Sequence, residues 1–267
     1  MSKNKLIQNN NISNQEDQIV ADFLKKRNLE RTNNKWPIPN PKKTIYTEYG
    51  KRICDIIISG PCIILLLPFY IVLAAAVFFC MGRPIIYKQT RTGKNGRAFN
   101  MLKFRSMNEK RDSNGELLPP SQRLTKFGKF IRKYSLDELP EFINVFMGDM
   151  SIIGPRPLPV FFADRMSERH KMRHSVKPGL ECPYIIPEGS NLSAYHWKFE
   201  NDIWYVENIS FKTDIKMMIN LFKLTFNMKN RESHAGGLSY FVGYDDNGHA
   251  VSLKKAQKIY LGSIKEQ

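Results

Sequence analysis

The residues best suited to chemistry are two adjacent carboxylates, Asp137 and Glu138, within the run Ser135–Pro140 (SLDELP). Ser135 and Glu138 have the spacing of a capping box, which predicts that a helix begins here. In that register Asp137 lies in the first turn, where free N–H groups and the helix dipole stabilise an anion. Pro140 is best tolerated early in a helix, so the register is open by a residue or two. We therefore expect Asp137 to have a low pKa and to stay ionised, as a nucleophile or a metal ligand requires. The alternative is a capped surface helix with acidic residues at its start.

Arg156 stands between two prolines in the run Gly154–Pro157, and a guanidinium held in this way is suited to bidentate contact with phosphate. The alternative is an arginine in a surface turn. An Asp-Glu pair with basic side chains fits phosphoryl chemistry: one carboxylate attacks phosphorus, the other holds a divalent cation, and the basic groups neutralise phosphate oxygens. Magnesium (Mg2+) is the expected metal, because it uses few carboxylates together with substrate phosphates. The sequence shows no Walker phosphate loop, dinucleotide-binding loop or Ser-His-Asp order.

The chain of 267 residues is strongly basic, with 41 Lys and Arg against 25 Asp and Glu and a formal net charge of +16. This excess predicts an anionic partner: a phosphorylated substrate, an anionic membrane face or nucleic acid. The nucleic-acid hypothesis depends on charge alone, so we expect no nucleic-acid partner. The 4 cysteines include no Cys-x-x-Cys pair and are expected to be reduced structural thiols.

A long apolar segment must position this chemistry at a membrane. From Ile56 to Gly82 no residue is charged, and this stretch exceeds the roughly 20 residues needed to cross a bilayer. Pro68 near its middle removes a helical hydrogen bond, and both flanks are basic, which favours the cytoplasmic side for both ends. These features predict a helix that breaks at Pro68, entering and leaving the same leaflet. A kinked helix that crosses the bilayer is the alternative.

The other elements predict an α+β fold. Two strands around Asn95-Gly96 form a hairpin over residues 84–107. A basic amphipathic helix at 124–133 leads to the Asp-Glu run, and further helices are expected at 160–174 and 213–228. Residues 15–31 predict either a helix or part of a disordered tail, and a second hairpin is expected around residues 245–248.

Several motifs follow one another in a fixed order over roughly residues 51–232: Lys51-Arg52 with Asp55, Pro68, Tyr87-Lys88-Gln89, Lys103–Met107, Phe127–Arg132, Ser135–Pro140, Asn144-Val145, Gly148–Ser151, Gly154–Pro157, Arg173-His174 with Pro178-Gly179, and Asp202 with Tyr205. In these motifs the chain resembles the bacterial sugar transferases, the monotopic phosphoglycosyl transferases. The resemblance implies a re-entrant membrane helix, then a small cytoplasmic catalytic domain of helices and a β-hairpin with amphipathic interfacial helices. The implied divisions are a variable N-terminal extension (1–45), the membrane helix (46–83), the catalytic domain (84–232) and a C-terminal extension (233–267).

The resemblance also implies a reaction at the bacterial cytoplasmic membrane. The family transfers a sugar 1-phosphate from a UDP-sugar to polyprenyl (undecaprenyl) phosphate, releases UMP and initiates capsule, exopolysaccharide or glycoprotein glycan synthesis. By this resemblance Asp137 is the nucleophile that forms a phosphosugar-aspartyl intermediate, and Glu138 binds Mg2+. The residues expected to contact substrate phosphate are Arg132, Arg156, Lys103 and Arg105.

The chain departs from the family pattern at three places. Leu67 replaces the serine that usually precedes Pro68, and residues 180–184 replace a Gly-Trp-Ala-Gln run. Ser190 stands where the family has a phosphate-binding arginine. These departures leave a second hypothesis open, a weakly active member that acts as a membrane scaffold for glycan assembly. The terminal extensions are candidates for homodimer contacts or for docking downstream glycosyltransferases.

Overall fold

The computed structural model describes residues 15–183, 193–226 and 240–265. It combines helices with short two-stranded sheets, as the predicted α+β class requires. The chain forms two compact units. Unit 1 comprises residues 1–51, 92–98 and 153–267, and unit 2 comprises residues 52–91 and 99–152. Unit 1 therefore takes segments from three parts of the chain.

Unit 2 is built from α3, a hairpin and short helices. Its elements in chain order are α3 (Lys51–Met81), β1 (Ile86–Thr92), β2 (Ala98–Phe104), α4 (Pro120–Arg123), α5 (Lys126–Lys133), the 3-10 turn η4 (Leu136–Glu138) and α6 (Glu141–Met147). The predicted hairpin is confirmed: β1 pairs with β2, and the connection contains the 3-10 turn η3 (Lys94–Gly96). Asn95 and Gly96 both adopt positive φ there, 56° and 75°, which explains why the turn uses Asn-Gly.

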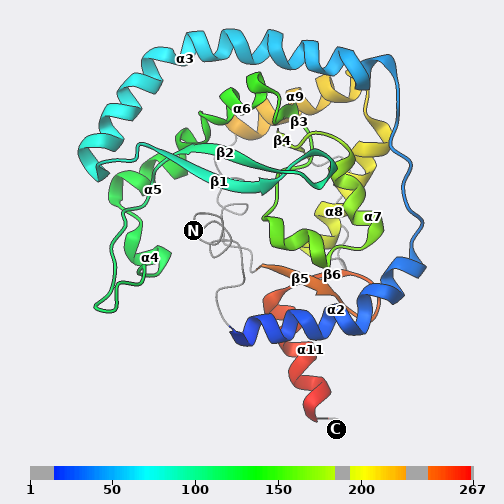
Figure 1. Cartoon of the computed structure of the whole chain (residues 1–267). Helices are drawn as coiled ribbons and strands as arrows, with labels where there is room; N and C mark the ends of the chain where they lie inside the picture. The colour runs from blue at the N-terminus through cyan, green and yellow to red at the C-terminus, as the bar shows by residue number, and fades with distance from the viewer. Residues whose placement is uncertain (1–14, 184–192, 227–239, 266–267) are drawn as a thin grey trace. The chain divides into compact units, whose positions relative to one another are not determined.

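The apolar segment is one continuous helix. A π-helical turn, η2 (Tyr46–Gly50), leads into α3, and both Pro61 and Pro68 lie inside the helix without ending it. Within the described part of the chain, Tyr46–Met81 is the one helix that is long and apolar enough to cross a membrane, and 11% of its most apolar stretch is buried. Figure 1 shows that α3 bends along its length. The interruption predicted at Pro68 is therefore absent, and the helix bends instead.

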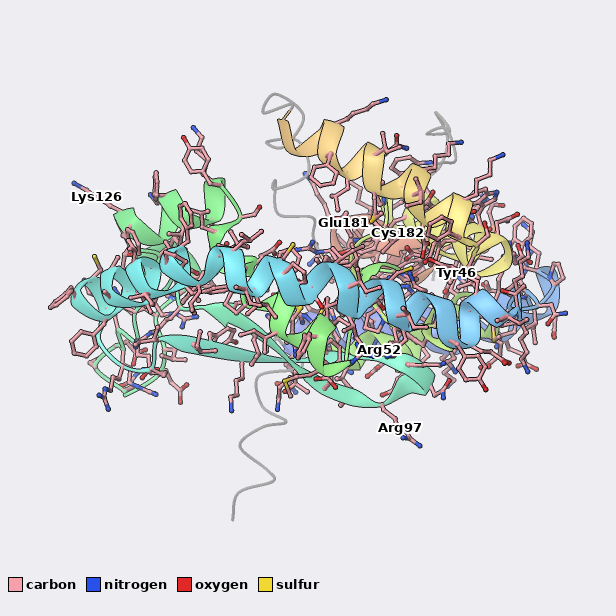
Figure 2. The ribbon with its side chains drawn as sticks, turned by 90° about the horizontal axis from the view of Figure 1, so that it is seen from above. Tyr46, Arg52, Arg97, Lys126, Glu181 and Cys182 are labelled. Carbon is pink, nitrogen blue, oxygen red and sulfur yellow. The ribbon has the colours of Figure 1, made fainter. Side chains whose placement is uncertain are left out.

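Both halves of α3 are fixed to the rest of unit 2. Near its start, Arg52, which is labelled in Figure 2, lies on the side of α3 that packs on α6. It donates to the carbonyl oxygens of Val145 and Phe146 at 2.7 Å each. Asp55, which is buried, accepts from Ser151 Oγ at 2.8 Å and from the Ile152 N–H at 3.0 Å. In the C-terminal half, an apolar cluster joins the helix to β2 and α5, and it consists of Leu73, Val77, Phe104 and Ile131. The membrane-type helix is thus also a structural element of the unit that carries Asp137.

Unit 1 contains the elements from both ends of the chain. They are α2 (Gln15–Lys35), three short helical segments η5 (Val160–Arg165), α7 (Glu168–Lys171) and η6 (Met172–Ser175), then β4 (Gly179–Glu181), α8 (Ala194–Asn208), α9 (Phe211–Phe226), β5 (Phe241–Tyr244), β6 (Ala250–Ser252) and α11 (Leu253–Lys265). The chain passes from unit 2 to unit 1 within β3 (Ser151–Ile153). The single helix predicted over 160–174 is wrong, because Met166 and Ser167 are extended and the Ser167 hydroxyl caps a new helix by accepting from the His170 N–H.

The two terminal segments fold together. Figure 1 shows α2 and α11 beside the β5–β6 hairpin, which pairs Tyr244 with Ala250 as predicted from the turn sequence. Their shared core consists of Val20, Ala21, Leu24, Val242, Val251 and Ala256. The other face of the hairpin packs through Phe241 and Tyr244 on aromatic residues of η5 and α8. Residues outside the expected catalytic domain therefore complete the core of unit 1.

This arrangement makes Leu24 a test of whether α2 belongs to the folded unit. Leu24 is 0% exposed between α2 and the C-terminal hairpin. We expect Leu24→Ala to lower the free energy of unfolding by about 2 to 5 kcal/mol, because it leaves a cavity in a closed core. Chemical denaturation followed by circular dichroism in detergent measures the change. Ile19→Ala, at a side chain on the same helix that is 50% exposed, is the control. Equal small effects of both variants would contradict a structural role for α2.

Candidate active site

The two carboxylates lie before a helix, in η4. Ser135 adopts the left-handed conformation (φ 54°, ψ 25°) that ends α5, and its side chain makes no cap. The following helix α6 begins at Glu141, with Pro140 as its N-cap. The predicted capping box is therefore wrong, and the helix begins after the Asp-Glu pair. The reason is local: Pro140 is accommodated best at the very start of a helix, which moves the start past Glu138.

Asp137 is 7% exposed, and its carboxyl group has a raised pKa. Burial is the main cause, and the neighbouring charge of Glu138 raises the pKa further. Lys103 and Arg132 act in the opposite direction and lower the pKa in part. The low pKa predicted from a helix N-terminus is therefore wrong, because burial of the carboxyl group raises the pKa. A carboxylate held in this environment is poorly solvated and more basic than usual, which makes it a stronger nucleophile when ionised.

Lys103 pairs with two carboxylates of the acidic run. Its Nζ lies 2.6 Å from Glu138 Oε1 and 3.2 Å from Glu141 Oε1. Glu141 is a site residue that the sequence analysis missed, and its side chain is 3% exposed. The available signal was its spacing, because residues three apart at a helix start face the same side. The structure thus gathers three carboxylates, those of Asp137, Glu138 and Glu141, around one ammonium group.

Asn144 fixes the strand that carries Lys103. Its Oδ1 accepts from the Leu102 N–H and its Nδ2 donates to the Asn100 carbonyl oxygen, both at 2.9 Å. Asn144 is buried in α6, so one side chain joins β2 to the helix that begins with Glu141. Two paired hydrogen bonds to a strand backbone define the register between these elements. This explains why an asparagine stands in the run after the Asp-Glu pair.

The two predicted arginine ligands of unit 2 have different surroundings. Arg132 on α5 is close enough to lower the pKa of Asp137, and its Nε donates to Ser106 Oγ at 2.8 Å. Arg105 is buried, and it donates to the carbonyl oxygens of Met107 (2.9 Å) and Arg83 (2.7 Å). Arg132 therefore belongs with the carboxylates. The contacts of Arg105 are those of a residue that holds the end of the hairpin.

Arg156 lies in unit 1, where its backbone and its guanidinium are both held. The Arg156 carbonyl oxygen accepts from Arg173 at 2.8 Å, and Arg173 forms a buried ion pair with Asp202 at 2.7 Å. Arg156 Nη1 donates to the Leu180 carbonyl oxygen at 3.0 Å and lies 3.2 Å from Glu181 Oε2. Glu181, labelled in Figure 2, belongs to the segment that departs from the family pattern. The guanidinium of Arg156, the predicted phosphate ligand, therefore already pairs with the carboxylate of Glu181.

The glycines on either side of this arginine are required by close backbone packing. A Cβ atom on Gly179 would lie 2.1 Å from the Gly154 nitrogen, and one on Gly154 would lie 2.7 Å from the Lys177 carbonyl oxygen. No larger residue fits at either position without moving the backbone. The Gly-Pro-Arg-Pro and Pro-Gly motifs are therefore packed against each other, which holds Arg156 in place. Ser190, another of the three departures, lies outside the described residues.

The side chains around Glu138 fit a magnesium ion. The donors are carboxylate oxygens, which Mg2+ prefers, and the Glu138 side chain is 27% exposed, so the ion and its waters have access. Glu138 is the accessible member of the group, since the side chain of Glu141 is 3% exposed. Glu138, the predicted metal ligand, is therefore next to Asp137, the predicted nucleophile, in the chain, and both residues lie in the same short turn η4.

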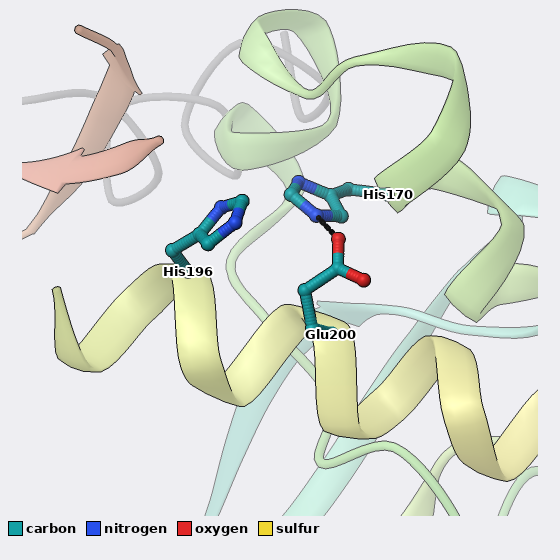
Figure 3. A group of neighbouring side chains, drawn as sticks. All are labelled: His170, His196 and Glu200. Carbon is teal, nitrogen blue, oxygen red and sulfur yellow. Dashed lines mark hydrogen bonds and ion pairs between the residues drawn. The ribbon is translucent and has the colours of Figure 1, made fainter. Parts of the chain in front are cut away.

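A second group of possible ligands lies in unit 1 and consists of His170, His196 and Glu200. Figure 3 shows His170 pointing toward Glu200, with Nε2 and Oε1 2.9 Å apart. The other ring nitrogen, Nδ1, lies 2.8 Å from the Tyr244 hydroxyl, and Arg169 pairs with both oxygens of Glu200. Burial lowers the pKa of His170, which keeps the ring neutral. These contacts form a hydrogen-bond network that joins β5 to α7 and α8. We therefore assign His170, His196 and Glu200 a structural role.

The raised pKa of Asp137 predicts that the ionised side chain, which a nucleophile requires, lowers the stability of the folded protein. The folded state binds the proton more readily than the unfolded state, so the stabilising contribution is present at low pH and is lost as pH rises through the folded pKa. We therefore expect Asp137→Asn to raise the melting temperature at pH 7 in EDTA, and the gain to shrink toward pH 3. Differential scanning fluorimetry from pH 3 to 8 measures this. Asp164→Asn, at an exposed carboxylate, is the control. A variant less stable than wild type at pH 7 would contradict the assignment.

Comparison with known proteins identifies the family. A model described as bacterial sugar transferase matches residues 46–228. "Uncharacterized sugar transferase EpsL" of Bacillus subtilis (strain 168) is 45% identical over 144 residues, covering 54% of this chain and 71% of the relative. The UDP-glucose:undecaprenyl-phosphate glucose-1-phosphate transferase of Klebsiella pneumoniae is 37% identical over 183 residues, covering 65% of this chain and 39% of the relative. This chain therefore spans less than half of that relative's length. Because the family model covers most of the chain, including Asp137, Glu138 and Arg156, the chain belongs to the bacterial sugar transferase family.

Proposed function

We propose that this protein transfers a sugar 1-phosphate from a UDP-sugar to polyprenyl phosphate and releases UMP. The observation that carries the proposal is the buried carboxylate of Asp137 with Glu138, Lys103 and Arg132 around it. The names of relatives support the substrate class. They include the glucose-1-phosphate transferase of Klebsiella pneumoniae and a UDP-N-acetylgalactosamine-undecaprenyl-phosphate N-acetylgalactosaminephosphotransferase of Aeromonas hydrophila, which is 35% identical over 185 residues.

In the proposed mechanism a carboxylate oxygen of Asp137 attacks the phosphorus atom next to the sugar. The bond from this phosphorus to the bridging oxygen breaks, UMP leaves with the electron pair, and a phosphosugar-aspartyl intermediate remains. An oxygen of polyprenyl phosphate then attacks the same phosphorus and regenerates the Asp137 carboxylate. Because Asp137 first attacks this phosphorus and is then displaced from it, the first product leaves before the acceptor reacts, which gives ping-pong kinetics.

The other residues have electrostatic roles in this proposal. Glu138 holds Mg2+, which when bound neutralises charge on the diphosphate of the donor. Lys103 and Arg132 stabilise negative charge that develops on phosphate oxygens near Asp137. Arg156 supplies a further guanidinium for phosphate, held ready by its contacts with Arg173 and β4.

The membrane arrangement is also part of the proposal. Basic residues flank α3 on both sides, so we place both ends of the helix at the cytoplasmic face, with the bend turning the helix back within one leaflet. On α9, Phe211, Ile219 and Phe222 are exposed among lysines, which suits a helix lying on an anionic membrane surface. An acceptor that is itself a lipid explains why a phosphotransferase would carry these elements.

The first test is UMP release from a panel of UDP-sugars with undecaprenyl phosphate and Mg2+ in nanodiscs. We expect release with at least one sugar, and Asp137→Asn to reduce it by about a thousandfold or more, because the nucleophile is lost. Asp164→Asn should retain wild-type turnover, and the melting temperatures show that both variants are folded. Near-normal turnover by Asp137→Asn would remove Asp137 from the nucleophile role. Donor binding by the wild type without UMP release from any sugar would support the scaffold hypothesis, which follows from the departure at Ser190.

The second test concerns topology. In a variant without the native cysteines at 54, 62, 80 and 182, single cysteines are introduced before Lys51 and after Arg83. We expect a membrane-impermeant maleimide to reach neither position in intact cells and both positions in inverted vesicles, because both ends lie on the cytoplasmic side. Labelling of the two positions from opposite sides would establish a helix that crosses the bilayer.

A further inference from the structure

Glu141 is a buried charge that the mechanism does not use. It is the first residue of α6, its side chain is 3% exposed, and its Oε1 lies 3.2 Å from Lys103 Nζ. The same ammonium group lies 2.6 Å from Glu138 Oε1. Lys103 is therefore shared by two carboxylates, one of them open to solvent and the other enclosed.

A divalent cation on Glu138 changes this balance. An ammonium group 2.6 Å from the same carboxylate oxygen would be repelled by the ion, and the repulsion is strong where little water is present. Lys103 must then move away from Glu138. Its backbone is held by the Asn144 contacts to Leu102 and Asn100, so the movement is confined to the side chain.

Glu141 offers the ammonium group a second position. Lys103 Nζ already lies 3.2 Å from Glu141 Oε1, and a positive charge beside a buried carboxylate is stabilising, so the Lys103–Glu141 ion pair favours keeping the ammonium group there when Glu138 releases it. Glu141 lies in the first turn of α6, next to the run that holds Asp137, and so keeps the lysine in the site.

We propose that Glu141 is a positioning residue for Lys103: it retains the ammonium group when a divalent cation takes Glu138, and holds it in reach of the substrate phosphate. This inference depends on the proposed function, because it takes Glu138 as the cation ligand. Before the cation binds, the Lys103 ammonium group pairs with the Glu138 carboxylate at the position that the cation would take. Cation affinity is therefore set by how easily Lys103 transfers to Glu141.

Mn2+ binding, measured by electron paramagnetic resonance on the full chain in detergent without substrate, tests this. We expect Glu141→Gln to weaken Mn2+ binding about tenfold, because Lys103 then loses its ion pair with Glu141 and stays on Glu138, where it competes with the ion. Lys103→Gln should strengthen binding. In the Lys103→Gln background the Glu141→Gln change should cost less than about threefold, since the residue it acts through is gone.

Two outcomes would overturn the inference. A loss of equal or greater size in the Lys103→Gln background would show that Glu141 acts on the ion directly, and unchanged Mn2+ binding by Glu141→Gln would show that Glu141 has a structural role alone. Glu109→Gln is the matched control, because Glu109 is an exposed carboxylate 3.8 Å from Arg105. If Glu141→Gln does not fold, Glu141→Asp keeps the charge at a shorter reach and should give an intermediate loss.

The same experiments separate this inference from the proposed function. Loss of Mn2+ binding in Glu138→Gln, together with UMP release by the wild type, supports the proposed function. If Glu141→Gln then binds Mn2+ as tightly as the wild type does, the positioning role alone is refuted. If the wild type binds no Mn2+, or if Glu138→Gln binds as the wild type does, the assignment of Glu138 as the cation ligand fails first, and the role of Glu141 fails with it.

Discussion

The need to compensate buried negative charge governs the structure of the candidate site. Asp137 and Glu141 are both buried, and a carboxylate in that position must have a nearby cation or remain protonated. Lys103 supplies the charge, but it comes from a strand far away in the sequence, so the strand must be placed accurately. The hydrogen bonds of Asn144 to β2 do this. The hairpin, α6 and the Asp-Glu turn therefore form one arrangement.

The membrane-type helix is part of that arrangement as well. Arg52 and Asp55 bind the backbone around α6 and β3, while Leu73 and Val77 enter the core beside β2. A helix that served as an anchor alone would need none of these contacts. Its polar first turn and its buried apolar face fix the elements around Asp137 to the one helix of the described residues that is long and apolar enough to cross a membrane.

In unit 1, segments from both terminal parts of the chain contribute to one hydrophobic core. A hydrophobic hairpin near the C-terminus cannot bury both faces alone, and it is covered by α2 on one side and by aromatic residues of η5 and α8 on the other. The His170 network adds polar contacts between the hairpin strand β5 and the helices. The same body carries Arg173 and Asp202, which hold Arg156, so the terminal segments and the arginine share one folded unit.

The sequence by itself determined the family motifs, the apolar helix, the Asn-Gly hairpin and the Asp-Glu pair, because each depends on local order along the chain. It predicted a helix start at Ser135 from the capping spacing and left the register open because of Pro140, and the structure starts the α-helix at Glu141. It did not reveal the raised pKa of Asp137 or the role of Glu141. Those were decided by tertiary structure alone, because burial and the pairing with Lys103 depend on which distant segments meet and how much water they exclude.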